Sequence, residues 1–321
     1  MALSKIVDLK RLVGVWPTMI TPLHNNSAKS IDYTTLAVLI EWYISSGVAG
    51  LFTVCQSSEM YNLSPEERLE LARFVKQKAG DRVLVAGCGT FAGTIEEKAK
   101  FIKLMSKEVD IVVIIVNQMA EKHESEEILK SNLEKLLELT DDIQLGLYEC
   151  PVPYHRCLSP QMMEWAAFTG RFVFHKDTVC SVAPIQAKLL ALQSVTDNKL
   201  GFFNANAATL KLSLEHGGAG YSGIAANFYP WMHAWLCGHW RDQSQMAEKV
   251  QRFLGLAETT LSHKYPGSAK VYLHRLCGVQ IEETCRVADY TFSDHEIACL
   301  QHVKGLMEDV CKETGIAFFG F

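Results

Sequence analysis

The chain has 321 residues, which exceeds the usual single-domain size but suits an α/β barrel of about 250 residues with a small appendage. Its 48% hydrophobic and 21% charged residues are typical of a globular protein with a large core, so the composition excludes a disordered chain. The net charge of −5, with acidic and basic residues interspersed, excludes the electrostatic footprint of a protein that binds nucleic acid or an anionic membrane. The expected ligand is therefore a small molecule.

Ten cysteines are scattered along the chain, and none forms the Cys-x-x-Cys pair that indicates a zinc site or thioredoxin-like redox chemistry. We interpret them as reduced thiols. Residues 1–8 lack the continuous apolar core of a signal peptide, and the longest strongly apolar run, 111–116, is far too short to cross a bilayer. The sequence thus predicts a cytoplasmic protein without a membrane partner.

Short apolar runs alternate with amphipathic helical segments along most of the chain. The apolar runs lie at residues 14–23, 50–55, 83–89, 111–116, 144–150, 172–176, 200–204 and 220–225. The helical segments lie at residues 33–46, 65–79, 95–107, 126–139, 160–168, 183–195 and 208–216. Eight apolar runs separated by helices indicate parallel β-α units, and eight is the number that closes a (β/α)8 TIM barrel.

Two of these helices have well-marked beginnings, because Ser64-Pro65 and Ser159-Pro160 each offer an N-cap hydroxyl followed by a proline at the first helical position. Past Trp231 the strand pattern ends, and helical patterns follow at 243–261, 269–276 and 294–311. We predict a barrel domain at residues 1–235 that carries the active site and a C-terminal helical bundle at residues 236–321. No low-complexity linker separates the two parts, so we expect them to pack together.

Lys176 lies near the end of the sixth apolar run, in the segment Arg171-Phe-Val-Phe-His-Lys-Asp-Thr178. Burial disfavours the charged form of an amine, lowers its pKa and makes a neutral nucleophile available. Such an amine can form a Schiff base with a ketone. For this segment alone, the alternative is a surface lysine that closes the strand and is stabilised by Asp177.

Polar residues follow several other predicted strands, and chemistry in such a barrel gathers at the carboxyl ends of the strands. The second strand ends in Cys55-Gln56-Ser57-Ser58-Glu59, the fifth in Tyr148-Glu149-Cys150, and the seventh in Asn204-Ala205-Asn206. With Lys176 they offer an amine nucleophile, a phenol for proton transfer and donors for a carboxylate. An enzyme that forms a Schiff base with a keto acid requires this set.

The chain resembles the dihydrodipicolinate synthase and N-acetylneuraminate lyase superfamily of pyruvate-handling class I aldolases over nearly its whole length. The resemblance rests on the order and spacing of several motifs, which are Gly14-Val-Trp-Pro-Thr-Met-Ile-Thr-Pro22, Glu59 with Leu63-Ser-Pro-Glu-Glu-Arg68, Tyr148 with Pro151, Lys176-Asp177, and Gly218-Ala-Gly-Tyr-Ser-Gly-Ile224 with Asn227 and Pro230. It implies a (β/α)8 barrel with a C-terminal helical extension. It also implies a homo-oligomer, either a dimer or a tetramer of two tight dimers.

By this resemblance, Lys176 is the Schiff-base lysine and Tyr148 is the tyrosine that moves protons to and from the substrate. Ser57 matches the second hydroxyl of the loop that binds the pyruvate carboxylate, and the further substrate-binding residues are expected to be Gln56, Ser58 and Ile224. No metal or other cofactor is implied.

The remaining polar residues near the site are expected to support it. Glu59 should hold its loop through hydrogen bonds, and strand alternation points Glu149 and Asp177 away from the barrel interior, with Glu149 against an arginine or lysine of a helix. Structural or supporting roles are the favoured interpretation of His155 and His175.

The chain departs from the pattern of the synthases at three places. Gln56 replaces the first hydroxyl of the carboxylate loop, Asn117-Gln118 stands in place of a relay tyrosine, and Pro153 stands in place of an arginine that binds the second substrate. Arg156, three residues further on, is a possible substitute for that arginine. Asn204-Ala205-Asn206 also replaces the acidic segment that contacts sugar hydroxyls in sialic acid lyases, so sugar-acid binding is not supported.

The sequence therefore predicts a class I lyase or aldolase that binds pyruvate or a related 2-oxo acid as an iminium on Lys176. The enzyme makes or breaks a carbon–carbon bond with an aldehyde-type partner that the sequence does not identify. The alternatives are 4-hydroxy-tetrahydrodipicolinate synthase, a keto-acid dehydratase on the same scaffold, and a catalytically weakened relative that binds a keto acid. Whether the altered positions reduce or redirect activity stays open at this point.

Overall fold

The computed structural model describes residues 9–320, and the segment 1–8, in which no signal-peptide core is expected, lies outside the described residues. Within 9–320, eight parallel strands form one sheet in the order β1-β8-β7-β6-β5-β4-β3-β2. The strands are β1 (Gly14–Val15), β2 (Gly50–Thr53), β3 (Leu84–Cys88), β4 (Ile111–Ile115), β5 (Leu145–Tyr148), β6 (Phe172–Asp177), β7 (Gly201–Asn204) and β8 (Gly220–Tyr221). A parallel bridge between Thr18 and Phe52 joins the two edges, so the predicted (β/α)8 barrel is confirmed.

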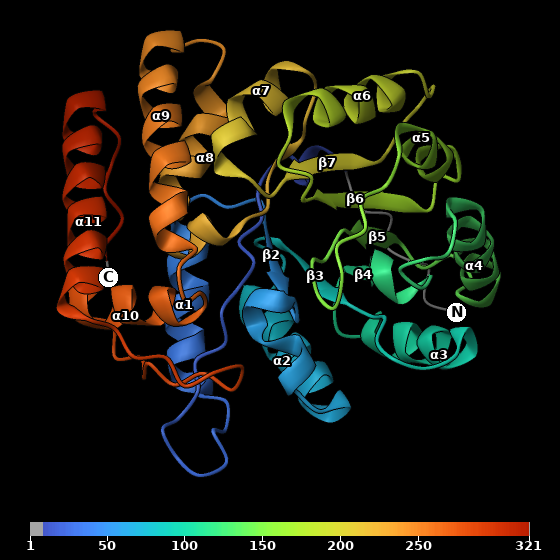
Figure 1. Cartoon of the computed structure of the whole chain (residues 1–321), viewed down its shortest axis with the longest axis horizontal. Coiled ribbons are helices and arrows are strands. Elements are labelled where there is room, and N and C mark those ends of the chain that lie inside the picture. The colour runs from blue at the N-terminus through green and yellow to red at the C-terminus, as the bar shows by residue number, and fades with distance from the viewer. Residues whose placement is uncertain (1–8, 321) are drawn as a thin grey trace.

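Helices follow the strands and surround the sheet (Figure 1). They are α1 (Tyr33–Ser45), α2 (Pro65–Ala79), α3 (Ile95–Met105), α4 (Glu126–Leu139), α5 (Pro160–Phe168), α6 (Val182–Gln193), α7 (Leu210–Glu215) and α8 (Pro230–His239). The predicted N-caps of α2 and α5 are confirmed. Ser64 Oγ accepts a hydrogen bond from Glu67 N at 3.2 Å, and Ser159 Oγ accepts one from Met162 N at 3.1 Å.

Aromatic rings fill the interior of the barrel below the carboxyl ends of the strands. Phe174 of β6 stacks on Phe203 of β7 with ring centroids 4.5 Å apart, and Trp16 lies 5.1 Å from Phe174. Since side chains two residues apart on a strand share a face, Phe174 places the side chain of Lys176 in the same interior, one layer higher. The aromatic core is therefore the floor beneath that amine.

Strands β1 and β8 are shorter than the sequence predicts. The run 14–23 pairs with β8 at Gly14 and Val15 and beyond them forms only isolated bridges, because Pro17 and Pro22 have no N–H to donate to a neighbouring strand. The run 220–225 pairs at Gly220 and Tyr221 and then turns into the 3-10 helix η6 (Ile224–Asn227).

Two of the predicted helical segments are each divided into two elements in the structure. The predicted segment 208–216 is divided between a 3-10 turn, η5 (Ala207–Thr209), and α7. The predicted segment 269–276 is divided between α10 (Gly267–Val271) and a π-helical turn, η7 (Tyr272–Leu276). Helix α8 was not predicted, although Pro230 at its first turn is a helix-start signal. The proposed boundary at residue 235 lies inside α8, and the division into two domains stays a prediction.

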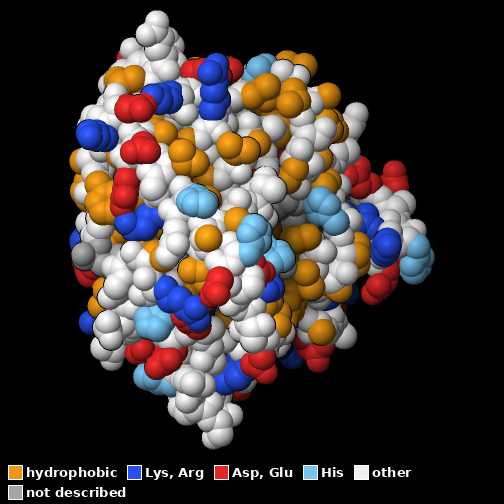
Figure 2. Space-filling view, turned by 60° about the vertical axis from the view of Figure 1, so that its left-hand side comes forward, with side chains coloured by type: hydrophobic (Ala, Val, Ile, Leu, Met, Phe, Trp, Pro, Cys, Tyr) orange, Lys and Arg blue, Asp and Glu red, His pale blue; other side chains and the backbone are white. Residues whose placement is uncertain are grey.

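The C-terminal helices α9 (Ser244–Leu261) and α11 (Asp294–Thr314) lie side by side and flank the barrel (Figure 1). Helix α9 reaches the loop after β7, where Gln251 Nε2 donates to the carbonyl oxygen of Ala207 at 2.8 Å. The described residues include no helix that combines the length and hydrophobicity needed to cross a membrane. Figure 2, which brings the C-terminal side forward, shows basic and acidic side chains interspersed on this face.

The C-terminal region is also bonded to the loop after β2. Glu59 accepts hydrogen bonds from Lys270 Nζ at 2.9 Å and from Val287 N at 2.8 Å, and it also accepts one from Arg286 N. Both Glu59 and Lys270 are buried. The hydrogen bonds of this carboxylate thus join the site loop to residues 270–287, which lie far away in the sequence.

Candidate active site

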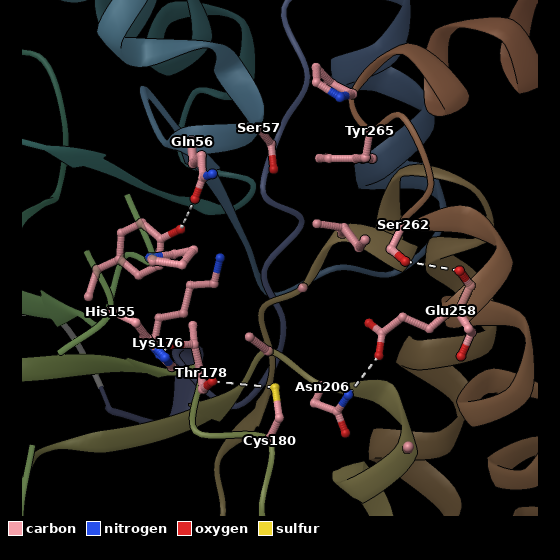
Figure 3. Close-up of a pocket in the computed structure, with 18 of the residues that line it drawn as sticks. Gln56, Ser57, His155, Lys176, Thr178, Cys180, Asn206, Glu258, Ser262 and Tyr265 are labelled. Carbon is pink, nitrogen blue, oxygen red and sulfur yellow. Dashed lines mark hydrogen bonds between the residues drawn. The ribbon is translucent and has the colours of Figure 1, made fainter. Parts of the chain in front are cut away.

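A cavity of about 710 Å³ opens at the carboxyl ends of the strands, between the barrel and the C-terminal helices (Figure 3). Its walls contain most of the residues that the sequence singled out, together with residues that it did not. The lining residues include Gln56, Ser57, Tyr148, His155, Lys176, Asn206, Ile224, Glu258, Thr259 and Ser262. Size, position and polarity match those of a small-molecule site in a barrel enzyme.

Lys176 projects into this cavity from β6 and is 4% exposed. Its Nζ atom lies 4.4 Å from the ring centroid of Tyr148 and 5.8 Å from that of Phe52. Burial lowers the pKa of the Lys176 amine, although nearby thiols and the carboxylate of Glu258 act in the opposite direction. The alternative of a surface lysine paired with Asp177 is wrong, because Asp177 binds Lys188 on the outside of the barrel.

Tyr148 is the direct neighbour of Lys176, since the two residues are register partners in the β5–β6 ladder. The phenol donates a hydrogen bond to Gln56 Oε1 at 3.4 Å, and the thiol of Cys150 donates to the same oxygen at 3.5 Å. Burial raises the pKa of Tyr148 well above its usual value, so the phenol keeps its proton at neutral pH. The pair therefore presents a nucleophile and a proton donor on adjacent strands.

The loop after β2 presents two of its three predicted substrate-binding side chains to the cavity. Gln56 and Ser57 line it, and Ser57 Oγ donates to Thr18 Oγ1 at 3.0 Å. Ser58 Oγ instead donates to the carbonyl oxygen of Met19 at 2.7 Å and does not line the cavity. The cause is the 3-10 helix η2 (Gln56–Ser58), in which each residue is rotated by about 120° from the last. The structure therefore assigns the Ser58 side chain to holding the loop, which corrects its expected contact with the substrate.

Both ends of this loop have unusual backbone conformations. Val54 has φ +47° and Glu59 has φ +59°, which is the left-handed region that glycine adopts at little cost and other residues seldom adopt. For a β-branched residue such as Val54 a positive φ is strained, and strain of this kind concentrates at functional sites. Glu59 holds this loop through hydrogen bonds, as the sequence predicts, and its partners are Lys270 and Val287 of the C-terminal region.

The residues at the remaining altered positions shape the loop after β5 and do not line the cavity. Asn117 Nδ2 donates to the carbonyl oxygens of Cys150, Val152 and Tyr154 at 2.6–2.9 Å. Arg156 Nη2 donates to the carbonyl oxygens of Glu121 and Glu124 and so does not replace the arginine missing at Pro153. Gln118 lies beside Asn117, and its Nε2 donates to Asn117 Oδ1 at 3.5 Å.

A buried cluster of charged side chains lies behind Lys176 and Tyr148, between the barrel and α6. Lys188 Nζ lies 2.6 Å from both Glu149 Oε1 and Asp177 Oδ1, and all three side chains are at most 2% exposed. The predicted outward direction of Glu149 and Asp177 is confirmed. Burial alone would lower the pKa of Lys188, but the two carboxylates overcome this effect and raise it.

The same cluster contains the set of side chains in the described residues that is spaced to hold a metal ion. Potential ligand atoms of Glu149, His175 and Asp177 lie within 4.8 Å of one another. The ammonium group of Lys188 already bonds both carboxylates and so provides their positive counter-charge.

The two histidines near the site lie in different places. His175 is completely buried in this cluster, whereas His155 lines the cavity with Nε2 2.8 Å from Thr178 Oγ1.

Glu258 of α9 is the main site residue that the sequence interpretation missed. Its Oε1 accepts from the Tyr221 hydroxyl at 2.9 Å, and its Oε2 accepts from Asn206 Nδ2 at 3.0 Å and Ala207 N at 2.8 Å. Burial raises the pKa of this carboxyl group. The sequence did contain a signal for a buried carboxylate at this position. Glu258 interrupts the apolar stripe that Leu254 and Leu261 form at helical spacing.

An (β/α)8 barrel with a desolvated lysine and a tyrosine at adjacent strand ends is the architecture of a Schiff-base-forming enzyme. Residues 11–298 match the model of the dihydrodipicolinate synthetase family, and the chain belongs to that family. It is 26% identical over 223 residues to the 4-hydroxy-tetrahydrodipicolinate synthase of Anaplasma marginale (strain Florida), covering 69% of this chain and 70% of that one. It is 25% identical to the enzyme of the same name from Leptothrix cholodnii, over 83% of this chain and 88% of that protein.

Solved structures share the fold of this chain at lower sequence identity. One is YagE, a prophage protein of the dihydrodipicolinic acid synthase family from E. coli K12, solved in complex with pyruvate, with a TM-score of 0.80, 21% identity and coverage of 93% and 98% of the two chains. Another is the dihydrodipicolinate synthase of Acinetobacter baumannii, also complexed with pyruvate, with a TM-score of 0.80, 20% identity and coverage of 95% and 100%.

Proposed function

We propose that this protein is a class I lyase or aldolase that binds pyruvate, or a related 2-oxo acid, as an iminium on Lys176. The observation that carries the proposal is the position of Lys176 Nζ, which is buried in the cavity 4.4 Å from the ring centroid of Tyr148. Membership of the dihydrodipicolinate synthetase family supports the same chemistry. No step requires a metal or an organic cofactor.

In the first half of the proposed reaction, the neutral amine of Lys176 attacks the keto carbon, and the carbinolamine then loses water to give an iminium. Lowering of the lysine pKa by burial increases the fraction of neutral amine available for this attack. Ser57 Oγ and the backbone around Ile224 lie on the cavity wall, where they can bind the carboxylate of the keto acid. Loss of a proton from the methyl group then gives the enamine.

In the second half, the enamine carbon attacks an aldehyde, and hydrolysis of the new iminium releases the product and the free amine. In the cleavage direction these steps run backwards. We assign the proton transfers to Tyr148, because it is the register partner of Lys176 and its ring centroid lies 4.4 Å from Lys176 Nζ. Its bonding partner, the amide oxygen of Gln56, accepts a hydrogen bond but cannot pass a proton on.

Other activities fit the site less well. A 4-hydroxy-tetrahydrodipicolinate synthase is a second candidate, favoured by the names of the relatives. Against it, the side chains of Asn117 and Arg156 are bonded to loop carbonyls, so neither a tyrosine relay nor an arginine reaches the cavity from these positions. A keto-acid dehydratase shares the first half of the mechanism. A relative that binds a keto acid without turning it over would not need a desolvated amine beside a phenol. The cytoplasmic location and the homo-oligomeric state stay predictions.

The proposed activity is tested by pyruvate release from a panel of 2-keto-3-deoxy acids, followed by coupled reduction to lactate, with and without a chelator. We expect turnover of at least one member, insensitive to the chelator and absent in Lys176→Ala. Lys199→Ala, which changes an exposed lysine, is the matched control and should retain full activity. Equal turnover in Lys176→Ala and the wild type would overturn the assignment.

A further inference from the structure

We propose that Glu258 determines the second substrate, selecting an uncharged, hydroxyl-bearing aldehyde and rejecting aldehydes that carry a carboxylate or phosphate. The inference rests on the proposed function, because it concerns the partner that reacts with the enamine on Lys176. It goes beyond that function by assigning a specificity-determining residue from α9, outside the barrel.

The position of Glu258 is fixed by hydrogen bonds from the loops of the barrel. Its carboxylate accepts from the hydroxyl of Tyr221 on β8, and from Asn206 Nδ2 and Ala207 N in the loop after β7, at 2.8–3.0 Å. Three donors from two strand ends leave the side chain little freedom to move away. In Figure 3, Glu258 lies on the opposite side of the cavity from Gln56, His155 and Lys176.

The charges around the cavity give this carboxylate its effect. Among the described lining residues Lys176 is the single lysine, and no arginine is present. When the enamine has formed, its nitrogen is uncharged and the bound keto acid carries its own carboxylate. A second anion would then meet two negative groups with no charged lysine or arginine of the cavity lining to offset them, and in a partly buried cavity this repulsion is strong.

Burial raises the pKa of Glu258, while the hydrogen bonds from Ala207 and Tyr221 and the charge of Lys176 act against that increase. Three donors, Tyr221 Oη, Asn206 Nδ2 and Ala207 N, bond this carboxylate and favour its ionised form. In that form Glu258 repels a second anion, and Glu258→Gln removes the repulsion.

The side chains around Glu258 are suited to hydroxyl groups. Asn206, Thr259 and Ser262 line the same wall and offer amide and hydroxyl groups that donate and accept hydrogen bonds. Ser262 Oγ donates to the carbonyl oxygen of Thr259 at 2.9 Å, which leaves its oxygen lone pairs directed to other partners. An aldehyde with several hydroxyl groups can form hydrogen bonds with these side chains, and its hydroxyl groups can donate to the carboxylate of Glu258.

The test compares aldehydes that differ in one terminal group, each condensed with pyruvate. The pairs are 4-hydroxybutanal with succinic semialdehyde and D-erythrose with D-erythrose 4-phosphate. The wild type should use the uncharged member with a kcat/KM at least about tenfold higher, the scale of a single well-placed polar discrimination. In Glu258→Gln this preference should shrink by about tenfold or more, and Glu248→Gln, which changes an exposed carboxylate of the same helix, should keep it.

Borohydride trapping of pyruvate on Lys176 accompanies each assay. A wild type that forms the adduct but uses the anionic aldehydes equally well would overturn the inference, whether or not Glu258→Gln folds. An unchanged preference in a Glu258→Gln protein that still forms the adduct would also overturn it. Absence of the adduct in the wild type would contradict the proposed function itself, so the two failures are distinguishable.

Discussion

The phenol of Tyr148 donates its hydrogen bond to the side-chain amide oxygen of Gln56, 3.4 Å away. An amide oxygen accepts this bond but has no proton of its own to exchange. A hydroxyl next to such a tyrosine could relay protons, but the amide of Gln56 cannot. This pair therefore has no proton relay. We expect Tyr148 to exchange its proton with the substrate or with water.

This arrangement predicts different results for the two partners. Tyr148→Phe should slow exchange of the pyruvate methyl protons with deuterated water on the order of 100-fold, the usual contribution of general acid-base catalysis. Gln56→Ala removes a long, neutral hydrogen bond and should change the same rate by less than about threefold. Proton NMR measures both rates. A loss in Gln56→Ala as large as that in Tyr148→Phe would show that the amide takes part in proton transfer.

Neighbouring serines of the loop after β2 should also give contrasting results. Ser57→Ala should weaken pyruvate binding about tenfold, because it removes a hydrogen bond to a charged carboxylate. Ser58→Ala should leave the affinity nearly unchanged but lower the free energy of unfolding by about 1–3 kcal/mol, because the carbonyl oxygen of buried Met19 loses its donor. Titration calorimetry and urea unfolding measure the two quantities. Weaker pyruvate binding in Ser58→Ala alone would reverse the assignments.

The buried lysine predicts how stability depends on pH. Because burial lowers the pKa of Lys176, the unfolded chain binds more protons than the folded chain between that lowered pKa and the ordinary value of 10.5. The buried amine of Lys176 therefore lowers the free energy of unfolding at neutral pH. This destabilisation becomes smaller as the pH rises towards 10.5. Lys176→Met should be more stable than the wild type at pH 7, and the difference should shrink at pH 9–10. Urea unfolding at several pH values checks this, and a constant difference would contradict the lowered pKa.

Lys188 should be essential for stability although it lies outside the cavity. Lys188→Met leaves the carboxylates of Glu149 and Asp177 buried without a counter-charge, so we expect a loss of about 3–5 kcal/mol. Lys130→Met is the matched control, since it removes an exposed pair with Glu134 on α4 and should cost less than about 1 kcal/mol. The free energy of unfolding in urea is the measurement. Equal losses in the two variants would mean that the buried cluster contributes no more than a surface pair.

The fold could be predicted from the sequence because its signals are local. Eight apolar runs separated by helical patterns, with Ser64-Pro65 and Ser159-Pro160 as helix starts, define the barrel. Lys176 and Tyr148 could be predicted to meet, since consecutive parallel strands pair and the carboxyl ends lie at one edge. Helix α8 was missed because it lies where the pattern of apolar runs ends.

The rest of the site depends on geometry that a sequence does not contain. Whether Ser57 or Ser58 faces the cavity is decided by one residue of rotation in a 3-10 turn, which follows a strained Val54. Glu258 enters from a helix whose apolar stripe predicts burial but does not indicate which strand ends it covers. Such contacts between distant segments follow from tertiary packing and not from local pattern.

The central claim is that Lys176 is the nucleophile, and borohydride reduction of the protein with pyruvate, followed by peptide mass mapping, tests it most directly. The account predicts a reduced pyruvyl adduct on the peptide that contains Lys176, formed faster as the pH rises through the lowered pKa of the amine. A folded protein that forms no adduct, or forms it on another lysine with Lys176 unmodified, would contradict the account.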